Sequence, residues 1–497
     1  MGFLNALLTV IEPLNIFLLS IGVIVGIIVG AIPGLTATLA ISLLLPFTFG
    51  LKAVPALIML IGIYVGGIYG GSITAILIRA PGTPGAAATA LDGYPLTQKG
   101  MGGQALGIAT TASFFGGILS AVIMIWASPI ISRFALKFSS AEYFSLAFFG
   151  LTIIFSVAGK SMLKGMVSGI LGLLVSTVGL DYIVPYPRFT FNIPELIIGF
   201  PLLPAVIGLF AVSEVFRMFE NTQEITGKVT SQIGRILPTL KELKALTGLF
   251  FKSGLIGTFI GALPGAGANV ASFLSYSEAK RTSKTPEKFG SGMIEGVAAS
   301  EAANNAVTGG ALIPMLTLGI PGDAVTAVLL GALTIQGLQP GPLLFRDHMD
   351  IIYPLFAGLI VANIVMVIAG LSGSLLFARI AMLKKTTLIP AIAIFSLIGA
   401  FAAEGSYVHM IIALCFGILG YILERYGFPL APIALAIILG PLAETSFRTA
   451  LIRSQGDLSV FYTRPISLIF IVLAFASIAF TIYREFKTVK ERISESM

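Results

Sequence analysis

The sequence contains almost none of the residues that bind transition metals or carry out redox chemistry. Cys415 is the single cysteine among 497 residues, so an internal disulfide is excluded. His348 and His409 are the only histidines. Zinc, haem and iron–sulfur sites need larger sets of cysteine and histidine ligands. We therefore expect no transition-metal site and no redox cofactor.

Charged residues are also scarce. They make up 11% of the chain, whereas a soluble globular protein has about 25%. Hydrophobic residues make up 56%, and the mean hydropathy is +0.98. A bilayer-spanning helix needs about 20 apolar residues, and the apolar stretches between Leu14 and Tyr483 provide about ten to twelve such segments. Runs such as 351–368 lack the alternation of membrane barrel strands. The composition predicts an all-α polytopic protein of the lipid bilayer.

The basic residues indicate the orientation of the chain in the membrane. Lysine and arginine number 30 against 23 acidic residues, a net charge of +7. They gather in short loops at 280–288 and 379–385 and in the tail at 484–492, as is typical of cytoplasmic segments. We therefore expect a cytoplasmic C-terminus and no nucleic-acid partner.

Two short motifs occur twice. Gly30–Gly34 (GAIPG) recurs 231 residues later as Gly261–Gly265 (GALPG), and the pattern at 70–82 recurs 240 residues later at 310–322. The difference of nine residues matches the extra polar segment at 281–289. Such duplication is typical of secondary transporters. Whether the two copies are inverted or parallel depends on the number of spans between them.

The duplication and the polar stretches together predict the domain organisation. A first half would carry the first copy of each Pro-Gly motif, and a second half would carry the second copy of each. We expect an elevator-type movement, in which a packed domain with both Pro-Gly repeats moves against a scaffold. The expected parts are a first half at 1–216 with motifs at 30–34 and 81–85, a polar cytoplasmic connector at 217–252, a second half at 253–483 with motifs at 261–265 and 320–322, and a basic cytoplasmic tail at 484–497.

The Pro-Gly pairs predict broken or re-entrant helices. Proline removes a backbone donor and glycine reaches unusual conformations, so each pair interrupts its helix. The helix that starts after a break presents free N–H groups to an anion, and the departing carbonyls suit a cation such as Na⁺. Expected substrate-binding residues are Pro33, Gly34, Thr36, Thr38, Pro264, Gly265, Gly267, Asn269 and Ser272, and expected cation-binding residues are Thr83, Gly322 and Asp323.

A polar stripe marks the segment Gly290–Gly310. On a helix, four of its polar residues would lie at i, i+3, i+4 and i+7 and share one face. They are Glu301, Asn304, Asn305 and Thr308. A carboxylate at membrane depth costs about 2.5–3.5 kcal/mol and usually faces a pathway or the bundle interior. A purely structural hydrogen-bond network is the alternative. We expect Asn304 and Asn305 to bind substrate, because neutral amides do not repel an anion, and Glu301 and Thr308 to bind the cation.

Several motifs resemble one known family. The segments GALPGAGANVASFLSYSEAKRTSK at 261–284, EGVAASEAANNAVTGGALIPMLTLGIPG at 295–322 and LLGALTIQGLQPGPLLF at 329–345 resemble the large membrane subunit of the tripartite tricarboxylate transporters. The resemblance extends over nearly the whole chain, including GAIPGLTATLAISLLLPFTF at 30–49. One departure is Asn192, which follows Arg188-Phe-Thr-Phe where the family pattern has glycine.

The resemblance implies a prokaryotic cytoplasmic-membrane importer. Its partners would be a small membrane subunit and a periplasmic or extracellular substrate-binding protein. Its cargo would be a di- or tricarboxylate or a related organic acid. The coupling ion would be Na⁺ or H⁺, with no other cofactor. A homodimer formed through the scaffold is the expected oligomer.

Two other function classes stay open on the residues alone. A passive channel or membrane scaffold can also contain repeats with broken helices. An intramembrane enzyme would need a nucleophile beside a base or a pair of carboxylates. Ser272 has no histidine near it in the sequence, so we expect no enzymatic activity.

Overall fold

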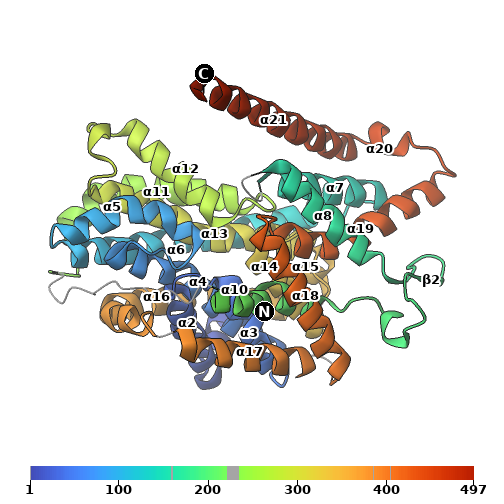
Figure 1. Ribbon diagram of the computed structural model, residues 1–497, viewed down its shortest axis with the longest axis horizontal. Helices are drawn as coiled ribbons and strands as arrows, with labels where there is room; N and C mark the ends of the chain where they lie inside the picture. The colour runs from blue at the N-terminus through green and yellow to red at the C-terminus, as the bar shows by residue number, and fades with distance from the viewer. Residues whose placement is uncertain (1, 158–160, 221–233, 384, 403–404, 497) are drawn as a thin grey trace.

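The computed structural model describes residues 2–157, 161–220, 234–383, 385–402 and 405–496. Within these residues the chain is almost entirely helical, and one two-stranded sheet, β1 with β2, is formed (Figure 1). Helices α5, α11 and α12 gather at one end of the molecule, and α18 and α19 lie toward the other (Figure 1). The elements are α1 (Phe3–Ile11), α2 (Pro13–Ala31), α3 (Ala37–Leu44), η1 (Leu45–Thr48), α4 (Ala53–Ile78), η2 (Pro84–Ala86), α5 (Ala87–Gln98), α6 (Gly102–Ala135), α7 (Ser140–Val157), α8 (Met162–Ser176), β1 (Gly179–Leu180), β2 (Pro187–Arg188), η3 (Pro194–Leu196), α9 (Leu202–Ile207), the π-helix η4 (Gly208–Val212), α10 (Ser213–Glu220), α11 (Leu240–Gly261), α12 (Gly267–Thr282), η5 (Pro286–Lys288), α13 (Ile294–Leu318), α14 (Ala324–Ile335), α15 (Pro342–Asp347), α16 (Met349–Ile380), α17 (Lys385–Ala402), α18 (Tyr407–Arg425), α19 (Ala431–Arg453), α20 (Val460–Thr463) and α21 (Pro465–Ser496).

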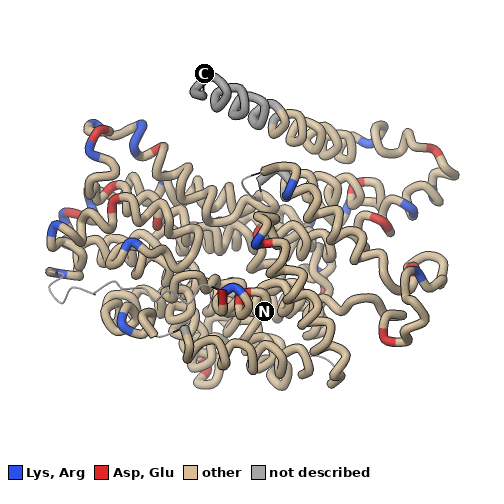
Figure 2. The backbone as a smooth tube through the Cα atoms, viewed as in Figure 1, with Lys and Arg blue, Asp and Glu red and all other residues tan. Residues whose placement is uncertain are grey.

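Eight helical segments in the described ranges are long and apolar enough to cross a membrane. They are α2, α4, α6, the continuous segment α9–η4–α10, α11, α16, α18 and α19, and shorter apolar helices include α8 and α14. Large apolar side chains such as Trp126 and Phe259 are exposed on the surface. Figure 2 shows the charged residues mostly at turns and helix ends. The prediction of an all-α polytopic membrane protein is confirmed.

Helices α2 and α4 run in parallel at very short distance. A β-carbon on Gly62, Gly66 or Gly70 of α4 would lie 2.6, 2.2 or 2.3 Å from the carbonyl oxygen of residue 19, 23 or 27 of α2. The residue numbers of the contacting positions increase together along α2 and α4, so the two helices are parallel. Glycine is therefore required at these positions by backbone contact rather than by backbone conformation.

Helices α11 and α13 repeat this arrangement in the second half of the chain. A β-carbon on Gly26 or Gly30 would lie 2.5 or 2.2 Å from the carbonyl oxygen of residue 63 or 67. The equivalent β-carbons on Gly257 and Gly261 would lie 2.3 and 2.8 Å from the carbonyl oxygens of residues 303 and 307. The two sets of contacts are related by the offsets 231 and 240 found in the sequence.

The backbone at the breaks is also the same in both halves. After α2, the N–H groups of residues 32 and 35 donate to the carbonyls of residues 29 and 32, at 3.1 and 3.0 Å. After α11, residues 263 and 266 donate to residues 260 and 263, at 3.1 and 3.2 Å. After α4 and α13, residues 80 and 320 donate to residues 74 and 314, both at 3.3 Å. Arg79 and Gly319, which end these two helices, both adopt left-handed backbone, with φ of 58° and 72°.

Helices α4 and α13 run in opposite directions. Helix α4 is parallel to α16, since Ile58 contacts Gly358 and Tyr69 contacts Gly370. Helix α13 is parallel to α6 through the contacts of residues 302 with 116 and 309 with 120. Helices α6 and α16 are antiparallel, because residue 117 contacts 363 whereas residue 110 contacts 370. It follows that α4 and α13 are antiparallel.

Gly82→Ala is expected to destabilise the protein strongly. A β-carbon on Gly82 would lie 1.9 Å from the carbonyl oxygen of Gly30, and overpacking of this kind costs about 1–3 kcal/mol or more of the free energy of unfolding. Gly50→Ala is the matched control, because no atom lies within 4 Å of a β-carbon there. Thermal unfolding of the two purified variants in detergent measures the difference. Equal transition temperatures would contradict the packing described for the first break.

Helices extend into the expected connector at 217–252 from both ends. Helix α10 continues to Glu220, and α11 begins at Leu240 with a capping box between Thr239 and Glu242. Residues 221–233 of that connector lie outside the described residues, as does Met497 of the expected tail. The rest of the tail continues helix α21 as far as Ser496. Figure 1 shows α21 along one edge of the molecule, with the C-terminus at its end.

Asn192 adopts a backbone conformation that favours glycine. Its φ is 60°, in the left-handed region, which asparagine tolerates better than most residues. The adjoining β-hairpin is anchored to α19, because Arg188 donates to Glu444 at 2.6 Å and Arg448 donates to Asp181 at 2.5 Å. The hydrogen bond from Arg448 is the main reason that the pKa of Asp181 is well below its usual range.

Candidate functional site

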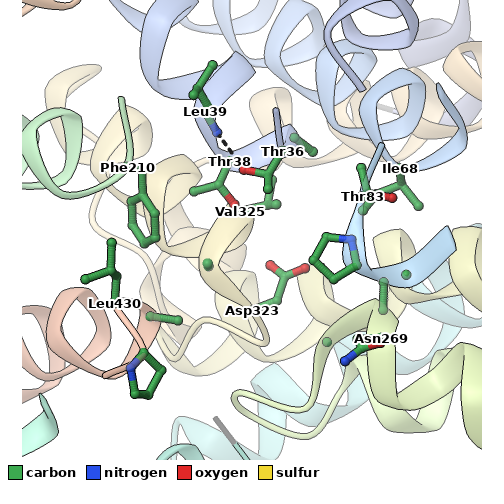
Figure 3. Close-up of a pocket in the computed structure, with 18 of the residues that line it drawn as sticks. Thr36, Thr38, Leu39, Ile68, Thr83, Phe210, Asn269, Asp323, Val325 and Leu430 are labelled. Atoms are coloured by element: carbon green, nitrogen blue, oxygen red, sulfur yellow. Dashed lines mark hydrogen bonds between the residues drawn. The ribbon is translucent and has the colours of Figure 1, made fainter. Parts of the chain in front are cut away.

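One cavity of about 680 Å³ lies where the broken helices meet (Figure 3). One wall is formed by residues of the first three Pro-Gly breaks and by the residues that directly follow the fourth. The opposite wall is formed by η4, α10 and the connection between α18 and α19. The lining residues are 34, 36–39, 68 and 81–85 from the first half, 265–270 and 323–325 from the second half, and 209–210, 213–214, 217, 424, 429–431 and 435 from the opposite wall.

Several helices begin at this cavity. The first residues of α3, η2, α12, α14 and α19 all line it. Thr36 caps α3, since its hydroxyl accepts a hydrogen bond from the N–H of Leu39 at 3.3 Å. Unpaired N–H groups and the positive ends of helix dipoles favour negative charge, so the helix ends at this cavity suit an anion.

Asp323 caps α14 from the wall of the cavity. Its carboxylate accepts hydrogen bonds from the N–H and the hydroxyl of Thr326, both at 2.8 Å. It also accepts a hydrogen bond of 2.6 Å from the hydroxyl of Tyr64 on α4. Figure 3 shows Asp323 among the residues that line the cavity, together with Thr36, Thr38 and Val325. The hydrogen bonds therefore join the fourth break to the first half of the chain.

The opposite wall contains a basic residue between two acidic residues. Arg217 of α10 lies 2.5 Å from Glu214 on the same helix and 3.3 Å from Glu424 on α18. It also donates to the carbonyl oxygen of Gly34 at the first break, at 3.1 Å. Arg217 therefore connects this wall with a Pro-Gly break.

The predicted polar stripe lies on α13, at the centre of the molecule. Glu301, Asn304, Asn305 and Thr308 are all fully buried. Glu301 accepts hydrogen bonds from Thr89, which follows the second break, and from Ser113 on α6 at 3.0 Å. Within the described residues, no basic side chain forms an ion pair with Glu301. Glu301 of the stripe thus joins α13 to α5 and α6 through hydrogen bonds, and it is a buried carboxylate without a cationic partner among the described residues.

Two buried oxygens at the second break, Oγ1 of Thr83 and Oδ1 of Asn304, have no hydrogen-bond partner among the described residues. Oδ1 and Nδ2 of Asn305, the next residue on α13, are also buried without a partner among these residues. The amide nitrogen of Asn304 donates to the carbonyl of Ile68, at 3.4 Å. A β-carbon on Gly85 would lie 2.2 Å from Oδ1 of Asn304, which places that oxygen against the break. Unpaired buried oxygens of this kind suit a hydrogen-bond donor or a cation.

Half of the residues predicted from the sequence line the cavity, and half do not. Ser272 is buried and donates to the carbonyl of Ala268 in its own helix, and Thr308 donates to that of Asn305. The structure thus brings some predicted residues together and places others in the surrounding packing. The lining residues are Gly34, Thr36, Thr38, Thr83, Gly265, Gly267, Asn269 and Asp323, and the others are Pro33, Pro264, Ser272, Glu301, Asn304, Asn305, Thr308 and Gly322.

The residues of the opposite wall were not predicted from the sequence to form part of a site. Arg217 was assigned to a polar connector, although it lies in α10 and lines the cavity. A signal was present, because Glu214 and Arg217 are spaced i, i+3 directly after an apolar stretch and can pair on one helix face. The π-helix before them left no comparable trace in the sequence. Such single π turns often occur at functional sites.

Comparison with known proteins agrees with the motifs. The sequence matches the family described as "Tripartite tricarboxylate transporter TctA family" over residues 16–435. It is 38% identical over 487 residues to the "Uncharacterized 52.8 kDa protein in TAR-I ttuC' 3'region" of Agrobacterium vitis, which covers 98% of this chain and 96% of that protein. It is 41% identical over 211 residues to the "Uncharacterized protein in TAR-II ttuC' 3'region" of the same organism, covering 42% of this chain and 87% of that protein.

Proposed function

The chain belongs to the tripartite tricarboxylate transporter TctA family, and we propose that it imports di- or tricarboxylates by symport with Na⁺ or H⁺. The family is one of transporter subunits and not of enzymes. The proposed setting is a prokaryotic cytoplasmic membrane, with the C-terminus inside. A small membrane subunit and an extracytoplasmic binding protein complete the proposed tripartite system, and the binding protein delivers the cargo.

The convergence of helix N-termini on one cavity carries this proposal. Four of these N-termini follow the Pro-Gly breaks, and α19 adds a fifth from the opposite wall. In secondary transporters, broken helices of this kind hold the carboxylate of a substrate near the midplane of the membrane. Hydroxyl and amide groups of Thr36, Thr38 and Asn269 line the same space and can donate hydrogen bonds to the anion.

The charge of the cargo requires a driving ion. Moving one charge across 100 mV changes the free energy by about 2.3 kcal/mol, so a trianion entering a negative cell costs about 7 kcal/mol. Co-transport of two or more cations offsets most of this cost. Symport also fits the cavity, because Glu214, Asp323 and Glu424 bring negative charge to a space that must accept an anion.

We assign the cation to the region behind the second break. Glu301 supplies a buried carboxylate, and Thr83 and Asn304 supply buried oxygens that lack partners among the described residues. Burying a lone carboxylate is costly, so a proton or a cation neutralises it. Asn304 thus takes part in cation binding in this proposal, rather than in the substrate contact expected from the sequence.

We propose that the two halves form an inverted repeat. The matching contacts at the offsets 231 and 240 support the duplication, and the opposite directions of α4 and α13 support the inversion. Alternating access then follows if the unit that contains the four breaks moves against the wall formed by α10, α18 and α19. Arg217 lies at the boundary between these two parts.

Uptake into proteoliposomes tests the proposal. We expect labelled citrate or succinate to accumulate when a Na⁺ or H⁺ gradient is imposed and the binding protein and small subunit are present. Accumulation driven by one gradient identifies the ion. Equilibration that does not depend on either gradient would support a passive channel instead, and an absence of flux with all three components would contradict the proposed substrates.

A further inference from the structure

We propose that Arg217 receives a carboxylate group of the cargo, and that Glu424 competes with the cargo for the same guanidinium group. The inference rests on the proposed carboxylate transport and assigns a binding residue on the wall that faces the Pro-Gly breaks. Arg217 is the only lysine or arginine among the described residues that line the cavity.

The contacts of Arg217 are unequal. Its Nη2 atom lies 2.5 Å from Glu214, whose side chain is 10% exposed, and donates to the carbonyl of Gly34 at 3.1 Å. Its Nη1 atom lies 3.3 Å from Glu424, whose side chain is 40% exposed. Glu424 is therefore the more distant and more hydrated carboxylate partner. An exposed ion pair of this kind contributes little free energy, so another carboxylate can replace it.

The guanidinium group is placed to bind an incoming anion. Its side chain is 36% exposed and it lines the cavity, so it is reachable from the space where the helix N-termini converge. Arginine presents several donors in one plane and binds a carboxylate through two hydrogen bonds at once. The contact with Glu214 fixes one side of the group and leaves the Nη1 side for exchange.

Arg217 contacts both walls of the cavity, so a ligand that binds it would act at the boundary between them. It belongs to α10, it contacts α18 through Glu424, and it contacts the first break through Gly34. A β-carbon on Gly34 would lie 3.5 Å from both Nη2 of Arg217 and Oε1 of Glu214, so the break packs directly against this ion pair. Cargo that replaces Glu424 thus changes the contacts on both sides of the boundary.

Competition predicts that two neutralising variants change the affinity in opposite directions. Arg217→Gln removes a charged hydrogen-bond donor and is expected to raise the KM for cargo by about 10-fold or more. Glu424→Gln removes the competitor and is expected to lower the KM by about two- to five-fold, the range for an exposed ion pair. Arg217→Lys keeps the charge without the planar fork, and it should give an intermediate KM.

The measurement is saturable uptake of labelled citrate or succinate by the complete three-component system in proteoliposomes, with thermal unfolding of each variant as a check of folding. Arg425→Gln is the matched control. Arg425 follows Glu424 on α18, but it pairs with Glu220 at 3.3 Å and does not line the cavity. Its KM should equal that of the wild type.

The outcomes separate this inference from the proposed function. Uptake by the wild type with unchanged KM in Arg217→Gln would overturn the role of Arg217 alone. A raised KM in both Arg217→Gln and Glu424→Gln would show that the ion pair is structural, and would also overturn the inference. If Arg217→Gln does not fold, the direction of the change in Glu424→Gln still decides between competition and a structural role. Absence of carboxylate uptake by the wild type would overturn the proposed function and the inference together.

Discussion

Gly265→Leu is expected to abolish uptake while the protein still inserts into the membrane. Gly265 has a φ of 80°, and its N–H donates to the carbonyl of Gly322 at 2.7 Å, which joins the third and fourth breaks. Leucine in left-handed backbone costs about 1–2 kcal/mol, and loss of the hydrogen bond costs about 1 kcal/mol more. A total of about 2–3 kcal/mol against the binding-competent backbone corresponds to about a 100-fold loss of affinity.

The same substitution at Gly248 provides the control for Gly265→Leu. Gly248 lies on the exposed surface of α11, and no atom lies within 4 Å of a β-carbon there. Gly248→Leu should therefore leave uptake unchanged. Cargo uptake and membrane insertion are measured for both variants in parallel. Normal uptake by Gly265→Leu would show that the breaks do not form the binding site.

Glu301→Gln is expected to remove the dependence of uptake on the cation gradient. Glutamine has nearly the same shape, and its amide oxygen can still accept a hydrogen bond from one of Thr89 and Ser113, whereas its NH2 group can donate to the hydroxyl of the other, so the packing of α13 is retained. The variant lacks the buried negative charge that a cation or proton would neutralise. Removing one partner of a buried charge pair costs about 3–5 kcal/mol, which is a loss of about 100-fold or more in affinity for the ion.

Accumulation of cargo as a function of imposed Na⁺ or H⁺ gradient measures the effect of Glu301→Gln. Glu295→Gln serves as the control, because it is the same substitution in the first turn of the same helix, and Glu295 is not fully buried. Gradient-driven accumulation by Glu301→Gln at the wild-type level would exclude Glu301 from coupling. The Gly265 and Glu301 variants thus test the substrate site and the ion site with different readouts.

Some features were predictable from the sequence because they depend only on local backbone chemistry or on the spacing of residues. The Pro-Gly pairs break their helices because proline and glycine act on the local backbone, whatever surrounds them. The four residues of the α13 stripe share a face because helical periodicity depends only on spacing.

The direction and partners of the helices were not predictable in the same way. Opposite directions of α4 and α13 depend on the number of spans between them, and short helices such as α3 and α14 make that number ambiguous in a sequence. The stripe on α13 indicates burial, but its spacing does not indicate that Thr89 and Ser113 are the partners of Glu301.

The sequence by itself determined that this is a helical membrane protein, that its helices break at four Pro-Gly pairs, and which family it belongs to, because composition, local backbone chemistry and motifs are properties of the chain. The tertiary structure alone decided that residues at the first three breaks and directly after the fourth line one cavity, and that Arg217 lines it too. It also decided which buried oxygens lack a partner among the described residues. The physical reason is that a cavity and its charge balance arise from contacts between segments far apart in the chain, and no spacing within one segment encodes them.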